Sequence, residues 1–150
     1  KAGAVMKTLA GSDNIVIAAD TIVTFDRHIL GKPSDLSDAK RMLSLLNGRE
    51  HHVITSLCIS CSEKIHGKRR ILTRSETTAV RFRKLSDSEI LEYLESIEYM
   101  DKAGSYAFQE NGSRIIDEVR GSITNVIGFP LRLFFAMCGE MDITERVFRK

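Results

Sequence analysis

The chain has 150 residues, of which 43% are hydrophobic and 28% are charged, and its formal net charge is +2. The length predicts a single domain with its own core, and the small net charge argues against a nucleic-acid-binding protein. No apolar run approaches the roughly 18 residues of a membrane-spanning helix, and the segment KAGAVMKTLA lacks the long apolar stretch of a secretory signal. We therefore expect a cytoplasmic protein with no membrane partner and no nucleic-acid partner.

Strand and helix patterns alternate along the chain. Short apolar runs and period-two alternation predict strands, whereas apolar residues at spacings of three and four predict helices. In chain order we expect a buried strand at 15–19, a hairpin at 21–30, a helix at 33–50, strands at 51–60 and 77–85, a capped helix at 86–97, short strands at 105–108 and 114–119, and a last helix from Pro130. This order predicts the α/β class, with a mixed twisted sheet flanked by helices.

The three cysteines are too few and odd in number for a disulfide framework. Cys58 and Cys61 form a C-x-x-C pattern with His66 nearby. Residues three apart on a strand point to opposite faces, so the two thiols are poorly placed to share a metal. We expect free thiols in a reducing compartment.

Asp20 is the first candidate for chemistry, because it follows an apolar strand directly. Ligands of α/β sheets tend to bind beyond the carboxyl ends of strands, and a partly desolvated carboxylate there can hold a metal or act as a general base. The alternative is a turn-forming aspartate that hydrogen-bonds to its own backbone. Spacing alone favours neither interpretation.

Lys32 lies between Gly31 and Pro33. Glycine allows an unusual backbone conformation and proline stiffens the residues that follow, so this turn would aim one ammonium group. The alternative is an ordinary lysine on the surface.

The segment DKAGSYAFQ, residues 101–109, also leads from a lysine and a glycine into a short apolar stretch. The amide of Gln109 both donates and accepts, so it could read the edge of a nucleobase. The alternative is a weak surface pair between Asp101 and Lys102, with Gln109 facing solvent. A further segment, 121–130, carries glycines and small polar residues before a helix, where backbone N–H groups suit phosphate.

Several blocks of sequence occur together in a characteristic order. They are AADT at 18–21, GKP at 31–33, LLNGREHHVITS at 45–56, EYLESIEYMDKAGSYAFQ at 92–109 and GSITNVIGFPL at 121–131. This arrangement resembles the Maf proteins, and the resemblance runs from Lys1 to about Leu131. It implies a fold related to that of the inosine triphosphate pyrophosphatases. It also implies cleavage of a nucleoside triphosphate between the α- and β-phosphates with a divalent cation, Mg²⁺ or Mn²⁺.

The resemblance implies catalytic roles for three residues. Asp20 would match the family's catalytic acid, which activates water or holds the metal. Lys32 would match the lysine that helps to bind the phosphates. Lys1 would match a second active-site lysine upstream of the strand that carries Asp20.

The resemblance also implies a substrate. Lys102 falls in a block that lines the cleft, and Thr21 and Gln109 match positions that sort the family by substrate. Ala-Asp-Thr with a glutamine is the pattern of the branch that favours thymidine and uridine triphosphates. Glu110 departs from the glycine usual in that branch, so the rim of the pocket is expected to differ.

We therefore expect hydrolysis of dTTP or UTP to the monophosphate and pyrophosphate. The alternatives are the same chemistry on 7-methyl-GTP or modified nucleotides, or a nucleotide-sensing regulator of septum formation with little turnover. Members of the family often form dimers, so the resemblance implies a possible homodimer.

One family feature is missing from the sequence. Maf proteins open with a strand and a loop of the type Ser-x-Ser-Pro-Arg-Arg that grips the phosphates, and residues 1–150 contain no such block. We expect a single Maf-like domain that lacks its N-terminal strand and phosphate loop and belongs to a longer parent protein.

Overall fold

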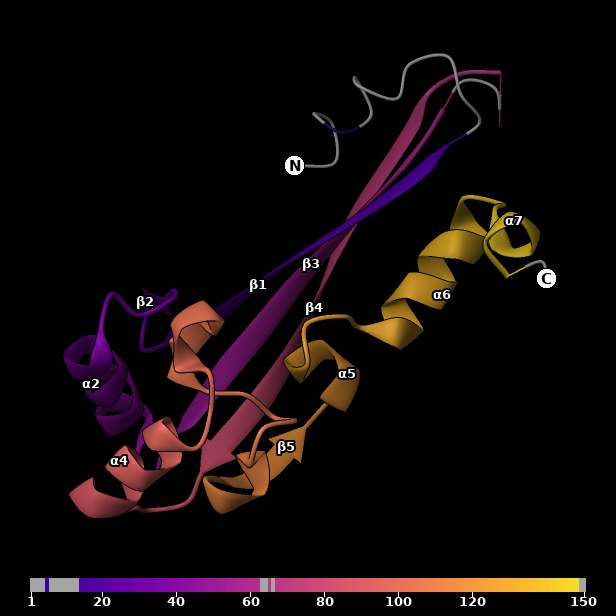
Figure 1. Cartoon of the computed structure of the whole chain (residues 1–150). Helices are drawn as coiled ribbons and strands as arrows, with labels where there is room; N and C mark the ends of the chain where they lie inside the picture. The colour runs from indigo at the N-terminus through magenta and orange to yellow at the C-terminus, as the bar shows by residue number, and fades with distance from the viewer. Residues whose placement is uncertain (1–4, 6–13, 63–64, 66, 149–150) are drawn as a thin grey trace.

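The computed structural model describes residue 5 and residues 14–62, 65 and 67–148. Its centre is one long twisted sheet with strand order β2-β1-β3-β4-β5 (Figure 1). The strands are β1 Ile15–Phe25, β2 His28–Leu30, β3 Glu50–Cys61, β4 Arg70–Phe82 and β5 Ile116–Arg120. The α/β fold class is confirmed, although all four pairings among these strands are antiparallel and no parallel pair occurs in this part of the chain.

Helical segments lie against the two ends of the sheet (Figure 1). The α-helices are α2 Leu36–Leu46, α4 Asp87–Glu95, α5 Ile123–Val126, α6 Leu131–Glu140 and α7 Thr144–Phe148, and the 3₁₀ turns are η1 Tyr99–Asp101, η2 Ala103–Ser105 and η3 Gly112–Arg114. None of the described helices is long and apolar enough to cross a membrane. A cytoplasmic location stays a prediction.

Several elements form where the local sequence predicted them. Asp26 and Arg27 both have positive φ, of 46° and 68°, as the tight turn between β1 and β2 requires. At the start of α4, Ser86 and Glu89 form the expected capping box. The end of α2 is fixed by Asn47, whose side chain donates to the carbonyl of Leu85 and accepts from its N–H, both at 2.8 Å.

The expectation for the first strand was wrong in two respects. The strand predicted at 15–19 continues to Phe25, so Asp20 lies in the middle of β1, opposite Ser56, and not after a strand end. This strand is also half-exposed, with Ile17 38% accessible, because an apolar run does not specify what covers it.

The strand predicted at 105–108 does not form. The chain turns through positive φ values at Gly104 and Ser105, of 71° and 63°, which are incompatible with a strand. This turn buries the ring of Tyr106. The strand predicted at 114–119 forms as β5 two residues later, because η3 precedes it.

Two hydrophobic clusters occupy the two ends of the sheet. The first packs α2 and α4 against β1, β3 and β4, with Leu43, Val53 and Tyr93 among its buried members. The second packs α6 against the other end and contains Cys61 and Cys138. Cys58, Cys61 and Cys138 are free thiols, as expected.

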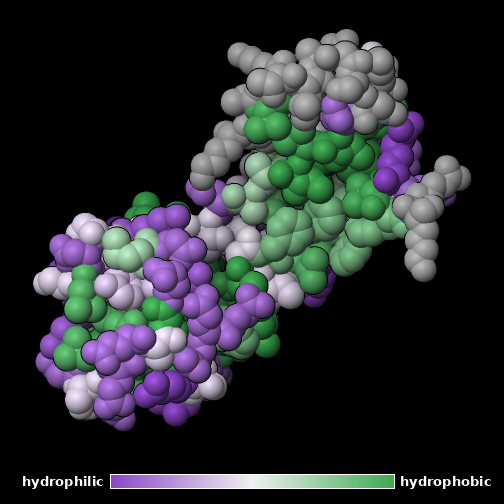
Figure 2. Space-filling model, in the orientation of Figure 1, coloured by the Kyte–Doolittle hydropathy of each residue, from purple (hydrophilic) through white to green (hydrophobic). Residues whose placement is uncertain are grey.

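The second cluster leaves apolar surface uncovered (Figure 2). Leu131, Phe135 and Phe148 are each about half-exposed, and the rings of Phe135 and Phe148 stack with their centroids 5.0 Å apart. A single chain does not test the possible homodimer, which stays a prediction.

Candidate active site

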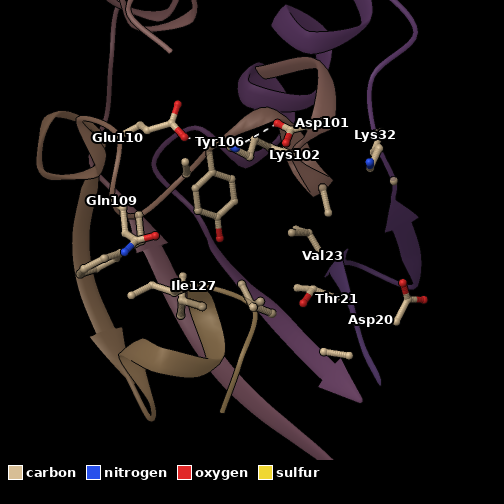
Figure 3. A pocket seen from close by; sticks show the side chains of 18 residues that line it. Asp20, Thr21, Val23, Lys32, Asp101, Lys102, Tyr106, Gln109, Glu110 and Ile127 are labelled. Carbon is tan, nitrogen blue, oxygen red and sulfur yellow. Dashed lines mark ion pairs between the residues drawn. The ribbon is translucent and has the colours of Figure 1, made fainter. Parts of the chain in front are cut away.

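A cavity of about 450 Å³ lies between β1, the segment after β2, residues 101–110 and residues 126–128 (Figure 3). This volume falls within the usual range of small-molecule sites. Five of the six predicted site residues line it: Asp20, Thr21, Lys32, Lys102 and Gln109. The sixth, Lys1, lies outside the described residues. Residues more than eighty positions apart in the sequence are therefore brought to one cavity.

The side of the cavity formed by the sheet and the turn after β2 is called here the strand wall, and it includes Asp20, Thr21, Val23, Lys32 and Val53. Thr21 and Val23 share one face of β1, because side chains alternate along a strand. In Figure 3, Asp20 and Lys32 lie on the same side of the cavity, opposite Gln109. The carboxylate of Asp20 and the ammonium group of Lys32 therefore lie on one side of the cavity, and the amide of Gln109 lies on the other.

The position of Lys32 is fixed by its neighbours, but not by an unusual conformation of Gly31. Gly31 is not among the residues with positive φ, and a side chain there would meet no atom within 4 Å. The anchors are the Gly31 carbonyl, which accepts from the N–H of Gly104 at 3.0 Å, and the buried Pro33.

Residues 101–110 form the opposite side, called here the loop wall. The ammonium group of Lys102 lies 2.9 Å from a carboxylate oxygen of Asp101 and 3.1 Å from one of Glu110, as the dashed lines in Figure 3 show. The hydrogen bond to Asp101 raises the pKa of Lys102 and lowers the pKa of Asp101. The N–H of Glu98, and then Lys102, lower the pKa of Glu110. Both acids therefore stay ionised and hold the lysine at the rim.

The loop wall packs closely on the sheet. A side chain at Gly104 would come within 3.0 Å of Val23, and φ there is +71°, so only glycine allows this approach. The hydroxyl of Tyr106 hydrogen-bonds the Nε2 of His51 at 2.8 Å, and the two rings meet edge to face with Phe82. Burial lowers the pKa of His51 to about 4, so the imidazole is neutral at pH 7.

A buried polar chain supports the strand wall from behind. Thr21 and Thr55 face each other across β1 and β3, with their hydroxyl oxygens 2.9 Å apart. Thr55 donates to the carbonyl of Asn125 at 3.1 Å. The side chain of Asn125 donates to the Thr78 hydroxyl at 2.8 Å. Sequence reasoning missed Thr55, Asn125, His51 and Tyr106, because their partners are distant in sequence and follow only from strand register and packing.

Residues 121–130 were expected to bind phosphate through backbone N–H groups, and several of these groups have partners within the protein. The N–H groups of residues 125–129 donate to acceptors within the segment, and that of Ser122 donates to Thr78. The segment contributes Val126, Ile127 and Gly128 to the cavity lining. The segment therefore forms one wall of the cavity, and its expected phosphate-binding role stays a prediction.

The acids near the cavity do not form a complete metal site by themselves. Across the described residues, no group of three His, Cys, Asp or Glu side chains could hold a metal ion. Asp101 and Glu110 are both paired with Lys102. Asp20, which is exposed and lines the cavity, is the ligand that the sequence predicted.

Comparison with known proteins identifies the family. A dTTP/UTP pyrophosphatase of Akkermansia muciniphila is 46% identical over 80% of this chain and 60% of its own length. A dTTP/UTP pyrophosphatase of Bacillus cereus is 41% identical over 95% of this chain and 71% of its own length. A human protein named probable bifunctional dTTP/UTP pyrophosphatase/methyltransferase is 48% identical over 81% of this chain and 20% of its own length.

The chain spans only 60% to 67% of the length of three bacterial dTTP/UTP pyrophosphatases, one of which is the protein of Akkermansia muciniphila. The family model described as Maf-like protein matches residues 1–141, which is nearly the whole sequence. The chain belongs to the Maf family.

Proposed function

We propose that this protein is a nucleoside triphosphate pyrophosphatase that hydrolyses dTTP and UTP to the monophosphate and pyrophosphate. The observation that carries the proposal is the lining of one cavity by an acid, two lysines and an amide, namely Asp20, Lys32, Lys102 and Gln109. The relatives named dTTP/UTP pyrophosphatase support the substrate class. Phosphoryl-transfer enzymes work mainly by positioning and charge stabilisation, and this set of groups supplies both.

Asp20 and Lys32 take the catalytic roles in this proposal. Asp20 orients the attacking water or removes its proton, because a carboxylate within reach of water is a competent general base. Lys32, on the same side of the cavity (Figure 3), stabilises the negative charge that develops on the leaving pyrophosphate. The predicted contribution of Lys1 lies outside the described residues.

Lys102, Thr21 and Gln109 bind the substrate in this proposal. Lys102 contributes positive charge at the rim of the loop wall. Gln109 reads the base, because its amide can accept from the N–H and donate to a carbonyl of uracil or thymine. Thr21 lies across the cavity and completes the nucleoside pocket.

A divalent cation fits this site when the substrate supplies most of its ligands. Magnesium is usually bound by one or two protein carboxylates together with substrate phosphates and water. Asp20 is the residue that would hold it, which agrees with the lack of a larger acidic cluster in the described part of the chain. When bound, the cation would neutralise phosphate charge.

The test is pyrophosphate release from dTTP, UTP, CTP, GTP and 7-methyl-GTP, with Mg²⁺ and with a chelator. We expect turnover of dTTP and UTP that requires the cation and exceeds turnover of the others. Preference for 7-methyl-GTP would assign the protein to the other substrate branch. Tight nucleotide binding without release of pyrophosphate from any substrate would favour the nucleotide-sensing regulator.

A further inference from the structure

The two lysines of the cavity come from opposite walls, but both act on one carboxylate. The hydrogen bond from Lys102 to Asp101, at 2.9 Å, lowers the pKa of Asp101 most, and the charge of Lys32 lowers it further. In Figure 3 these three side chains lie at the same end of the cavity. Two ammonium groups near one anion can also bind the charged oxygens of a single triphosphate. The relative position of the two lysines therefore matters for such a ligand.

A turn behind the cavity lining joins the backbone segments that carry these lysines. Gly104 donates its N–H to the carbonyl of Gly31 at 3.0 Å, and Gly31 directly precedes Lys32. The N–H of Ser105 donates to the carbonyl of Lys102 at 3.2 Å. Residues 104 and 105 therefore bond to both lysine-bearing segments, although neither of them lines the cavity.

Ser105 has a backbone conformation that serine rarely adopts. Its φ is +63°, next to +71° at Gly104, and a positive φ is unfavourable for a residue that has a side chain. Ser105 is also fully buried, so this is not a turn at the surface. Residues in such conformations persist only where the surrounding structure holds them, and they cluster at functional sites.

The group that holds Ser105 lies on α2. The hydroxyl of Ser105 donates to the sulfur of Met42 at 3.2 Å, and both residues are buried. The helix α2 begins shortly after Lys32. The segment that carries Lys32 is thus held on one side by the N–H of Gly104 and on the other, through α2, by Ser105.

We propose that Ser105 is a positioning residue, and that the turn it forms with Gly104 sets the spacing of Lys32 and Lys102 so that both bind the triphosphate of one nucleotide. The inference rests on the proposed function for the identity of the ligand. The turn fixes the backbone of each lysine, whereas the exposed ion pairs of Lys102 can be exchanged for phosphate oxygens. A monophosphate offers the two lysines only one phosphate group to share, so its binding should depend on the turn much less.

The first experiment measures Kd by calorimetry, with Mg²⁺, for dTMP and for the α,β-methylene analogue of dTTP, which is not cleaved between those phosphates. Ser105→Ala removes the hydroxyl that holds the turn, and Met42→Leu nearly conserves volume but removes the acceptor of that hydroxyl. We expect either change to raise Kd for the triphosphate analogue about tenfold, the size of one weakened charged hydrogen bond, and Kd for dTMP by less than about twofold.

The matched control is Ser60→Ala, because Ser60 is also a fully buried serine but does not line the cavity. It should leave both Kd values unchanged. If Ser105→Ala and Met42→Leu keep the Kd of the triphosphate analogue within about twofold of wild type, or weaken the binding of dTMP equally, the turn supports only the fold and the proposal is wrong.

The second experiment tests whether Ser105 acts through the lysines. For dTTP, kcat/KM is compared with and without Ser105→Ala in wild type, in Lys32→Ala and in Lys102→Ala. We expect a fall of about tenfold in wild type and of less than about twofold in either lysine variant, because the spacing has no effect once one lysine is absent. Equal falls in all three proteins would mean that Ser105 supports the cavity in general, which contradicts the proposal.

The inference and the proposed function can fail separately. Absence of pyrophosphate release from every nucleotide would end the proposed function, but the Kd values do not depend on turnover, and the second experiment would then be measured as Kd for the same analogue. Failure of the wild-type protein to bind the analogue would overturn the inference as well. Thermal unfolding of each variant shows that the fold is kept, and Met42→Leu carries the comparison if Ser105→Ala does not fold.

Discussion

The two walls of the cavity are held by different kinds of interaction. Behind the strand wall, Thr55 and Asn125 are fully buried and joined by directional hydrogen bonds. At the loop wall, Lys102 and Glu110 are joined by ion pairs between side chains that are 26% and 40% exposed. Buried hydrogen bonds fix geometry, because leaving one unsatisfied is costly, whereas exposed ion pairs contribute little to stability and rearrange easily. The strand wall is thus suited to positioning, and the loop wall to adjustable charge.

Asp20→Asn should have the largest effect of the substitutions that test this contrast. Loss of a positioned base lowers the rate roughly 10²–10⁴-fold, while the exposed position of Asp20 predicts an unchanged fold. The measurement is kcat for pyrophosphate release together with thermal unfolding. Asp87→Asn is the matched control, because Asp87 is an exposed aspartate paired with Lys40. A variant that keeps a tenth of the wild-type kcat would remove Asp20 from the role of base.

Lys32→Ala should come next. Removing one preorganised group that stabilises transition-state charge costs about 2.7–4 kcal/mol, which corresponds to a fall of about 10²–10³-fold in kcat/KM. Lys40→Ala is the control, since Lys40 is a surface lysine away from the cavity lining. If the two variants behave alike in steady-state kinetics, the position of Lys32 has no catalytic consequence.

The hydrogen bond between His51 and Tyr106 joins the two walls, and it predicts a pH dependence of stability. The folded-state pKa of His51 is about 4, below its usual 6.5. Between these values the unfolded chain binds a proton that the folded chain does not, so stability falls as pH falls. From pH 7 to pH 5 this group should lower the free energy of unfolding by about 2 kcal/mol.

Urea denaturation at the two pH values measures this loss. The comparison is between His51→Gln, which lacks the titrating group and should lose this part of the slope, and His52→Gln, which replaces the exposed neighbour on the same strand and should keep it. Equal slopes in all three proteins would show that His51 titrates normally.

The substitution Gln109→Glu tests whether the loop wall recognises the nucleobase. A carboxylate accepts but does not donate, so the carbonyl that faced the amide NH₂ would lose its partner at about 1–3 kcal/mol. Activity on dTTP and UTP should fall about 5–150-fold, and the unfolding temperature should change little because Gln109 is exposed. Unchanged relative rates for dTTP, UTP and 7-methyl-GTP would mean that the base is read elsewhere.

Glu110→Gln should have the smallest effect, and in the opposite direction. It removes one of the two carboxylates that hold Lys102, so the lysine is freer to meet the substrate and less negative charge faces the phosphates. An exposed pair contributes about 0–1 kcal/mol, which predicts a fall in KM of up to about fivefold with kcat unchanged. Glu92→Gln, which breaks the exposed pair with Arg114, is the control. A rise in KM would show that Glu110 supports substrate binding.

Local sequence signals were sufficient to predict several elements, and the family resemblance was sufficient to name five residues of the cavity lining. The turn at Asp26-Arg27, the capping box at Ser86 and the end of α2 at Asn47 depend on neighbours a few residues away, so local preferences were sufficient. The family resemblance named Asp20, Thr21, Lys32, Lys102 and Gln109, and these residues do line one cavity.

The position, burial and hydrogen bonds of the residues around the cavity depend on the tertiary structure. Asp20 lies within β1 and not after it, because the length of a strand depends on its partner, here β3. Tyr106 is buried in a turn where a strand was expected, because Gly104 packs on Val23. The bond between Thr21 and Thr55 exists because strand register places them opposite each other. Contacts between residues far apart in sequence carry no local signal, since register and packing are set only when the whole sheet forms.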